Sequence, residues 1–218
     1  MRYPPTHRDD TRRKIIHSAR KLFNRFGFDK VSIEQIMASA SLTRGGFYRH
    51  FKSKSDLYAE VLSCFFTDPQ WANSWEGVSV DLNGFDVGSQ IIRAYLSREH
   101  VDDIDNSCPM VALPSDVARA GEAAKRAFET TFAAMVDILQ RDVRSSDPEP
   151  RRVALAIAAL CVGGMVIARA SNERMLADEL RAAAADVALK LGGWHQGATR
   201  KRRISAARQP AQNSARTD

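Results

Sequence analysis

The sequence lacks the features that mark disulfide-bonded, membrane-spanning and β-sheet proteins. Its 218 residues include only three cysteines, an odd number without metal-ligand spacing, so we expect neither a disulfide framework nor a zinc site. No uninterrupted apolar run of about 18 residues occurs, and the start of the chain has no apolar signal-peptide core. Apolar and polar residues rarely alternate with a period of two, which argues against half-buried strands. These absences predict a cytoplasmic, all-α protein that does not enter a membrane.

Enzyme signatures are absent as well. The chain has no G-x-G-x-x-G or P-loop pattern, no serine nucleophile elbow and no cluster of histidines and carboxylates. Its five histidines are scattered along the sequence. We therefore expect neither an enzyme nor a protein that carries a metal or another cofactor.

Charge is present but unevenly distributed. Residues 1–57 contain 13 Lys or Arg and 5 Asp or Glu, a net charge of +8, whereas residues 58–194 contain 13 and 20, a net charge of −7. Residues 195–218 contain 6 and 1, a net charge of +5. A basic end on an acidic body is typical of a protein that binds nucleic acid at one end, because Lys and Arg neutralise phosphates. The alternative is a solvated surface that happens to be basic.

Apolar periodicity predicts about nine helices, arranged as a DNA-binding domain over residues 1–57, a helical body over residues 58–193 and a basic disordered tail over residues 194–218. In the first domain a helix over residues 10–26 precedes two short helices. Ser32, with its capping-box partner three residues on, begins the first short one, residues 43–50 form the next, and Ser53 caps a fourth helix.

The body is predicted to hold the remaining helices. Residues 67–84 are expected to be irregular and residues 98–106 to be an acidic link. The helix that begins at residue 151 is rich in Ala and Gly and apolar on most sides, so it must be buried on several faces. With the last helix it is predicted to form a four-helix bundle across the two-fold axis of a homodimer. The expected helices of the body cover residues 86–97, 107–119, 122–143, 151–170 and 172–191.

Residues 43–50 carry the side chains best suited to DNA recognition. Two short helices joined by a tight link, after a longer basic helix, form the geometry that places the second short helix in the major groove. Thr43 and Arg44 lie at its N-terminus, where backbone amides favour phosphate and where Arg can reach a guanine edge. Gly45 and Gly46 cost roughly 1 kcal/mol each relative to alanine in a helix. Their lack of side chains lets the backbone approach the groove floor.

The other side chains of this helix divide between packing and recognition. Phe47 and Phe51, four residues apart, are predicted to be the buried side that docks on the first two helices. Tyr48, Arg49 and His50 point elsewhere and offer a phenol, a guanidinium and an imidazole to phosphate or base.

Residues 31–57 resemble one known family closely. The run VSIEQIMASASLTRGGFYRHFKSKSDL is similar to the TetR family of transcriptional repressors, and with the first helix it covers about a quarter of the chain. The family usually has Ala, Thr or Ser near Gly46. The resemblance implies a pseudo-palindromic operator read by a dimer, and a C-terminal ligand-binding and dimerisation domain. It also implies phosphate contacts from one set of residues and base contacts from another, namely Thr43, Tyr48, His50 and Lys54 for phosphate and Arg44 and Gly45 for bases.

A pocket for a mainly apolar small molecule is expected between the helices of the body. Helical spacing alone predicts the same side chains as plain core, so both interpretations stay open. Cys108 precedes a proline at a predicted helix start, which would lower the pKa of its thiol, whereas the nearby Asp102, Asp103 and Asp105 would raise it. A reactive thiol and a buried inert one are therefore both possible. The candidate effector-binding residues are Phe65, Trp71, Tyr95, Cys108, Met110, Phe128 and Phe132.

The sequence as a whole predicts a sequence-specific DNA-binding transcriptional regulator, a repressor released from its operator when a small molecule binds the body. The alternatives are an activator, a helical small-molecule sensor whose DNA-binding domain is vestigial, and a redox or electrophile sensor acting through Cys108.

Overall fold

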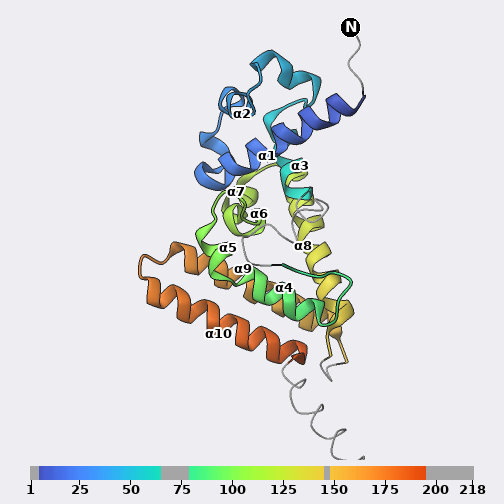
Figure 1. The fold of residues 1–218 in the computed structure, drawn as a ribbon, viewed down its shortest axis with the longest axis vertical. Coiled ribbons are helices and arrows are strands. Elements are labelled where there is room, and N and C mark those ends of the chain that lie inside the picture. The colour runs from blue at the N-terminus through green and yellow to red at the C-terminus, as the bar shows by residue number, and fades with distance from the viewer. Residues whose placement is uncertain (1–4, 65–78, 145–147, 195–218) are drawn as a thin grey trace, which may run out of the picture.

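The computed structural model describes residues 5–64, 79–144 and 148–194, and in these ranges the chain forms helices and no strand. Ten α-helices and one 3-10 helix follow one another from a head at the N-terminal end to a body whose far side is formed by α9 (Pro150–Ala170) and α10 (Arg174–Gly192) (Figure 1). The expected all-α fold is therefore confirmed. Of the candidate effector residues, Phe65 and Trp71 lie outside the described residues, as does the predicted tail from residue 195 onward.

Two short helices account for the difference between the expected nine helices and the eleven found in the described ranges. One is α5 (Arg98–Asp102), which begins at Ser97 because the Ser97 hydroxyl caps it, in a segment predicted to be a link. The other arises because the helix expected over residues 107–119 is divided at Pro114 into α6 (Pro109–Ala112) and α7 (Pro114–Arg119). Proline has no amide hydrogen to continue the first helix, but it fits the first turn of the second.

The head consists of α1 (Pro5–Lys30), α2 (Ile33–Ser39), the 3-10 helix η1 (Arg44–Arg49) and α3 (Lys54–Ser63). The backbone of α1 leaves helical geometry at Gly27, where φ is +78° and ψ is 168°, as the glycine at that position predicts. The four elements enclose one apolar core, whose largest buried members are Tyr58, Phe23, Phe47 and Phe51.

The head core continues into the body without a gap. α3 packs against α8 (Glu122–Asp142), and the Thr131 hydroxyl on α8 donates to the carbonyl of Leu62 at 2.6 Å. Leu113, Val117 and Ala124 from the body belong to the same buried cluster as the head residues. A change in the body can therefore reach the head through packed side chains.

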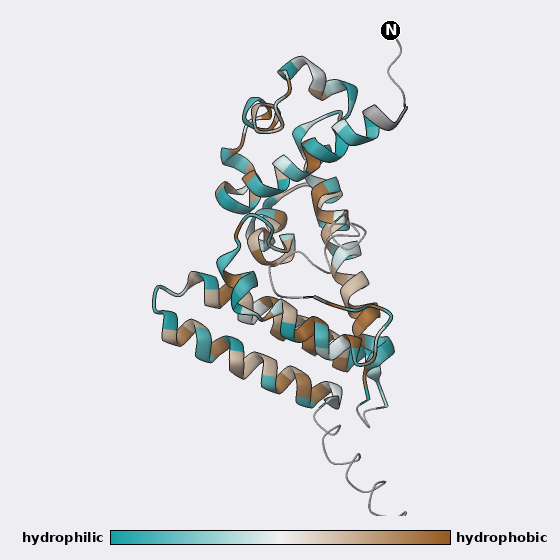
Figure 2. Ribbon diagram, in the orientation of Figure 1, coloured by the Kyte–Doolittle hydropathy of each residue, from teal (hydrophilic) through white to brown (hydrophobic). Residues whose placement is uncertain are grey.

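The body is built on the pair α9 and α10, to which α8 and α4 (Val87–Tyr95) are packed. Small residues let the two long helices approach closely, since a Cβ built on Gly164 would lie 3.0 Å from the Cβ of Ala184. Hydrophobic residues run along α9, whereas the visible face of α1 is mostly hydrophilic (Figure 2). By length and composition α9 could cross a membrane, but buried helices of soluble proteins meet the same criterion, and its buried residues pack among α4, α8 and α10.

Candidate nucleic-acid interface

The first short helix of the head is fixed at its start by a capping box. The Ser32 hydroxyl accepts a hydrogen bond from the Gln35 amide at 3.2 Å, and the Gln35 side chain accepts one from the Ser32 amide at 2.7 Å. Both amides would otherwise have no partner at the end of the helix. The predicted N-cap is therefore confirmed, and α2 is short because Ala40 and Ser41 leave the helix, Ser41 with φ of +57°.

The second short helix occupies the expected place but is a 3-10 helix. η1 spans Arg44–Arg49, and its first bond runs from the Gly46 amide to the Thr43 carbonyl at 3.0 Å. Adjacent glycines disfavour the α-helix, and a tighter 3-10 turn is common in such short segments. Thr43 is the N-cap residue, but its side chain caps no amide of η1. Its hydroxyl is therefore not used by the helix.

η1 divides its side chains between the core and solvent as the sequence predicts. Phe47 is 0% exposed and Phe51 is 2% exposed, so these two rings anchor the helix on α1 and α2. Tyr48 is 61% exposed, and its ring packs edge-on against Phe47 with 5.3 Å between centroids. Arg44 has 66% of its side chain exposed and pairs with Glu34 at 2.8 Å. The exposed face thus presents a guanidinium and a phenol on a rigid apolar base.

The two glycines of η1 face different surroundings. A Cβ on Gly45 would meet no atom within 4 Å, whereas one on Gly46 would touch the methyl of Met37 at 3.5 Å. Gly45 therefore borders open space on the exposed face, and Gly46 faces α2. This agrees with a backbone surface at Gly45 that another molecule can approach closely.

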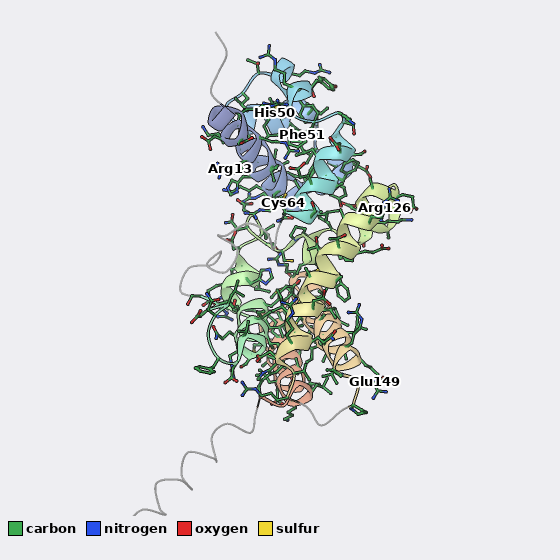
Figure 3. All side chains as sticks on the ribbon, turned by 90° about the vertical axis from the view of Figure 1, so that its right-hand side faces the viewer. Arg13, His50, Phe51, Cys64, Arg126 and Glu149 are labelled. Carbon is green, nitrogen blue, oxygen red and sulfur yellow. The ribbon has the colours of Figure 1, made fainter. Side chains whose placement is uncertain are left out.

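His50 lies in a basic environment next to α1. Figure 3 shows it beside Phe51 at the head end of the molecule. Its ring is half-buried, and burial together with Arg8, Arg12 and Arg49 lowers the pKa of the imidazole below its usual value. Arg8 also donates to the carbonyl of Arg49 at 3.4 Å, which links α1 to the end of η1. These cations gather at one edge of the helix-turn-helix.

Lys54 is placed differently from what a phosphate contact requires. Its ammonium donates to the carbonyls of Phe28 and Val31 at 2.9 Å each and lies 4.2 Å from the centre of the Phe28 ring. The break of α1 at Gly27 leaves carbonyls without helical partners, and Lys54 satisfies them. Sequence reasoning could not show this, because the two segments are more than twenty residues apart. The backbone amide of Lys54, at the start of α3, remains a predicted phosphate contact.

The candidate effector residues that the structure describes all belong to the core of the body or pack against it. Tyr95, Cys108 and Met110 are buried, and Phe128 and Phe132 on α8 are half-buried. Burial raises the pKa of the Cys108 thiol to about 11. The helix start at Pro109 therefore does not make this thiol reactive, and the interpretation of Cys108 as a buried inert residue fits better. Among the described residues no group of His, Cys, Asp or Glu could hold a metal ion.

Sequence reasoning missed two polar residues deep in the body. His100 is 0% exposed, and Arg169, on the otherwise apolar α9, donates to the hydroxyl of Ser107 at 2.6 Å and to two carbonyls, those of His100 and Asp103. An arginine that follows a long apolar run within α9 was the available signal, because such a charge needs partners when it is buried.

Comparison with known proteins agrees with this geometry. Residues 15–61 match the family model described as bacterial regulatory proteins, tetR family. The chain is 42% identical over 52 residues to the HTH-type transcriptional regulator AcrR of Shigella flexneri, which is 24% of each chain. It is 33% identical over 101 residues to the transposon Tn10 TetC protein of Escherichia coli, covering 46% of this chain and 49% of that one. The matches thus span between a quarter and a half of these relatives.

The likeness of the fold extends further along the chain. A solved transcriptional regulator of the TetR family from Cytophaga hutchinsonii superposes with a TM-score of 0.65 at 18% identity, covering 86% of this chain and 98% of that one. Residues 15–61 thus match the N-terminal domain of bacterial regulatory proteins of the tetR family, and the described chain shares its fold with solved regulators of that family.

Proposed function

We propose that this protein is a sequence-specific DNA-binding transcriptional regulator whose η1 enters the major groove. The observation that carries the proposal is the exposed face of η1, where Arg44, Tyr48 and the bare backbone at Gly45 stand on the buried rings of Phe47 and Phe51. Arg44 would read a base edge, and Tyr48, Thr43 and His50 would contact phosphates. Arg49 and Gly46 complete the proposed surface, together with the backbone amide of Lys54.

A homodimer would present two such surfaces to a pseudo-palindromic operator. Support comes from one face of α10, where apolar residues recur at intervals of three and four and are exposed or half-exposed. Such a stripe on a surface helix needs a partner to cover it. The pairing of α9 and α10 with their mates would bury it in a four-helix bundle. The residues of this stripe are Leu176, Leu180, Ala183, Val187 and Leu191.

The body is proposed to bind a small, mainly apolar effector that releases the protein from DNA, acting in the cytoplasm as a repressor. The half-buried rings of Phe128 and Phe132 on α8 support a site here, because α8 joins the body to α3 of the head. An activator would use the same contacts at a differently placed operator. Sensing through Cys108 is the less favoured alternative, since an oxidant would first have to reach a thiol with 0% exposure.

Arg44 provides the direct test, because an arginine of similar exposure that also faces a glutamate exists elsewhere in the chain. Arg126 on α8 is 67% exposed and pairs with Glu122 at 3.8 Å (Figure 3). We expect Arg44→Ala to weaken binding to a duplex from the region upstream of the gene by about tenfold or more, as loss of a bidentate guanine contact does. Arg126→Ala should bind as the wild type does. The measurement is fluorescence anisotropy of the labelled duplex at moderate salt.

Two outcomes would contradict the proposal. One is equal binding by the wild type and Arg44→Ala. The other is affinity that does not fall as salt rises, because phosphate contacts release counterions and must depend on salt.

A further inference from the structure

A groove lies where the end of α1 meets the body, away from the face of η1. It has a volume of about 580 Å³, within the range of small-molecule sites. Residues from α1, from α5, α6 and the segment between them, and from the adjoining ends of α9 and α10 form its walls. One wall is apolar and is made by Val101, Ile104, Val111, Val166, Ala168 and Ala177.

The lining also carries an excess of positive charge. Arg25, Arg169 and Arg174 line the groove, and Asp102 is the one carboxylate among the lining residues. Arg25 is matched by Asp105, to which it donates from two nitrogens. Arg174 is 70% exposed and lies 3.9 Å from Asp102, at the limit of an ion pair. The third guanidinium of the lining has no carboxylate within ion-pair distance among the described residues.

Arg169 is that guanidinium. Within the described residues it forms hydrogen bonds with one hydroxyl and two carbonyls but no ion pair, and its Nε is buried without a partner. A neutral set of partners satisfies the hydrogens of a cation but not its charge. An anion placed in the groove would supply the missing charge.

Asn24 adds a second unsatisfied polar atom to the same groove. Its side-chain nitrogen donates to the carbonyls of Asp105 at 3.3 Å and Ser107 at 3.0 Å, while its oxygen is buried without a partner. Asn24 and Arg25 belong to α1, so the wall of the groove is also the attachment of the head to the body. A ligand in the groove would contact both the head and the body.

We propose that this groove binds a small organic anion with a short apolar body, its carboxylate facing Arg169 and Arg174 and its chain lying on the wall formed around Ile104. The site is distinct from the described candidate effector residues in the core of the body, since none of these lines the groove. The proposal stands without DNA binding, because its test contains no DNA.

The experiment compares octanoate with octanamide, which has the same chain length and no charge, by calorimetric titration of the full-length protein. We expect octanoate to bind at least fivefold more tightly than octanamide. Arg174→Gln should remove that preference, since this exposed side chain can be replaced without leaving a buried group unpaired. Arg151→Gln is the control, because Arg151 lies at the other end of α9, is 57% exposed and pairs with Asp137 at 3.2 Å.

A second variant separates the groove from the core of the body. Ile104 is 46% exposed in the free protein, so Ile104→Asp should fold, and its carboxylate should repel octanoate from the groove. Loss of octanoate binding in this variant supports the proposal. Equal binding of octanoate and octanamide, or unchanged octanoate binding in both Arg174→Gln and Ile104→Asp, overturns it.

Discussion

His100 is the residue whose chemistry depends most on the fold. Its Nδ1 donates to the carbonyl of Tyr95 at 2.6 Å, and its Nε2 accepts from the amide of Cys108 at 3.3 Å. This arrangement fits a neutral imidazole with one hydrogen. Burial, with Arg169 nearby, lowers the pKa of His100 to about 3. A proton on Nε2 would have to replace an accepted hydrogen bond and would add a charge next to the guanidinium.

The stability of the protein should therefore fall as the pH is lowered from 7. The unfolded chain takes up a proton near pH 6.5 that the folded chain refuses until near pH 3. Between these values the unfolded state binds more protons, so the free energy of unfolding decreases, by about 2 kcal/mol between pH 7 and pH 5 from this residue alone. Urea unfolding at pH 7, 6 and 5 measures this decrease in the free energy of unfolding.

His100→Gln should be less stable than the wild type at pH 7 but should lose less stability on acidification. His17→Gln changes an exposed histidine on α1 and should keep the wild-type dependence of stability on pH. It is the control for the contribution of the carboxylates. A wild-type slope in His100→Gln would show that His100 takes up its proton at the same pH in the folded and unfolded states.

At the scale of elements, η1 is where the demands of folding and of recognition oppose each other. Gly45 and Gly46 both cost helix stability, yet a Cβ would fit at either position. We expect Gly45→Ala to raise the free energy of unfolding by about 0.5 to 1 kcal/mol and to weaken DNA binding, because the new methyl projects from the exposed face. Gly46→Ala, whose methyl would face Met37, should gain similar stability with a smaller loss of affinity.

Chemical denaturation of the same two variants measures the expected gain in stability, and fluorescence anisotropy measures the expected loss of DNA affinity. If Gly45→Ala bound DNA as tightly as the wild type, the backbone of η1 would not approach the groove floor. Recognition would then have to depend on the side chains alone.

The elements were predictable to the extent that local signals define them. The cap at Ser32, the break at Gly27 and the start at Pro109 depend on neighbouring residues, so the sequence alone located them. The 3-10 geometry of η1 was not predictable, because α and 3-10 turns differ by small energies in so short a segment. The hydrogen bonds of Lys54 could not be predicted for another reason, since its partners are distant in sequence.

The same division applies to the candidate site. The outward direction of Arg44 and Tyr48 follows from the burial of Phe47 and Phe51 at helical spacing. The groove between α1 and the body does not follow from any periodicity. It arises where the attachment of the head, the segment after α5 and the ends of α9 and α10 meet, and only tertiary structure brings these together.

At the scale of the whole molecule, charge and apolar surface are separated along the long axis. The basic head lies at one end, and the apolar stripe of α10 lies at the other (Figures 1 and 2). Recognition and self-association would thus use opposite ends of the molecule. Because the head and body share a continuous core at Leu113, Val117 and Ala124, the spacing of two heads in a dimer would be set by the pairing of their bodies.

Val187, in the middle of the α10 stripe and 45% exposed, tests that arrangement. Val187→Glu would place a carboxylate against its own symmetry mate near the two-fold axis, which is unfavourable without a partner. We expect sedimentation to show a dimer for the wild type and a monomer for this variant, with affinity for a full palindrome falling to that for a half-site. Phe85→Glu, at an apolar residue that is 91% exposed outside α9 and α10, is the control and should remain dimeric. A dimeric Val187→Glu protein would place the interface on another face, and a wild type that stays monomeric at micromolar concentration would remove the basis for reading a palindrome.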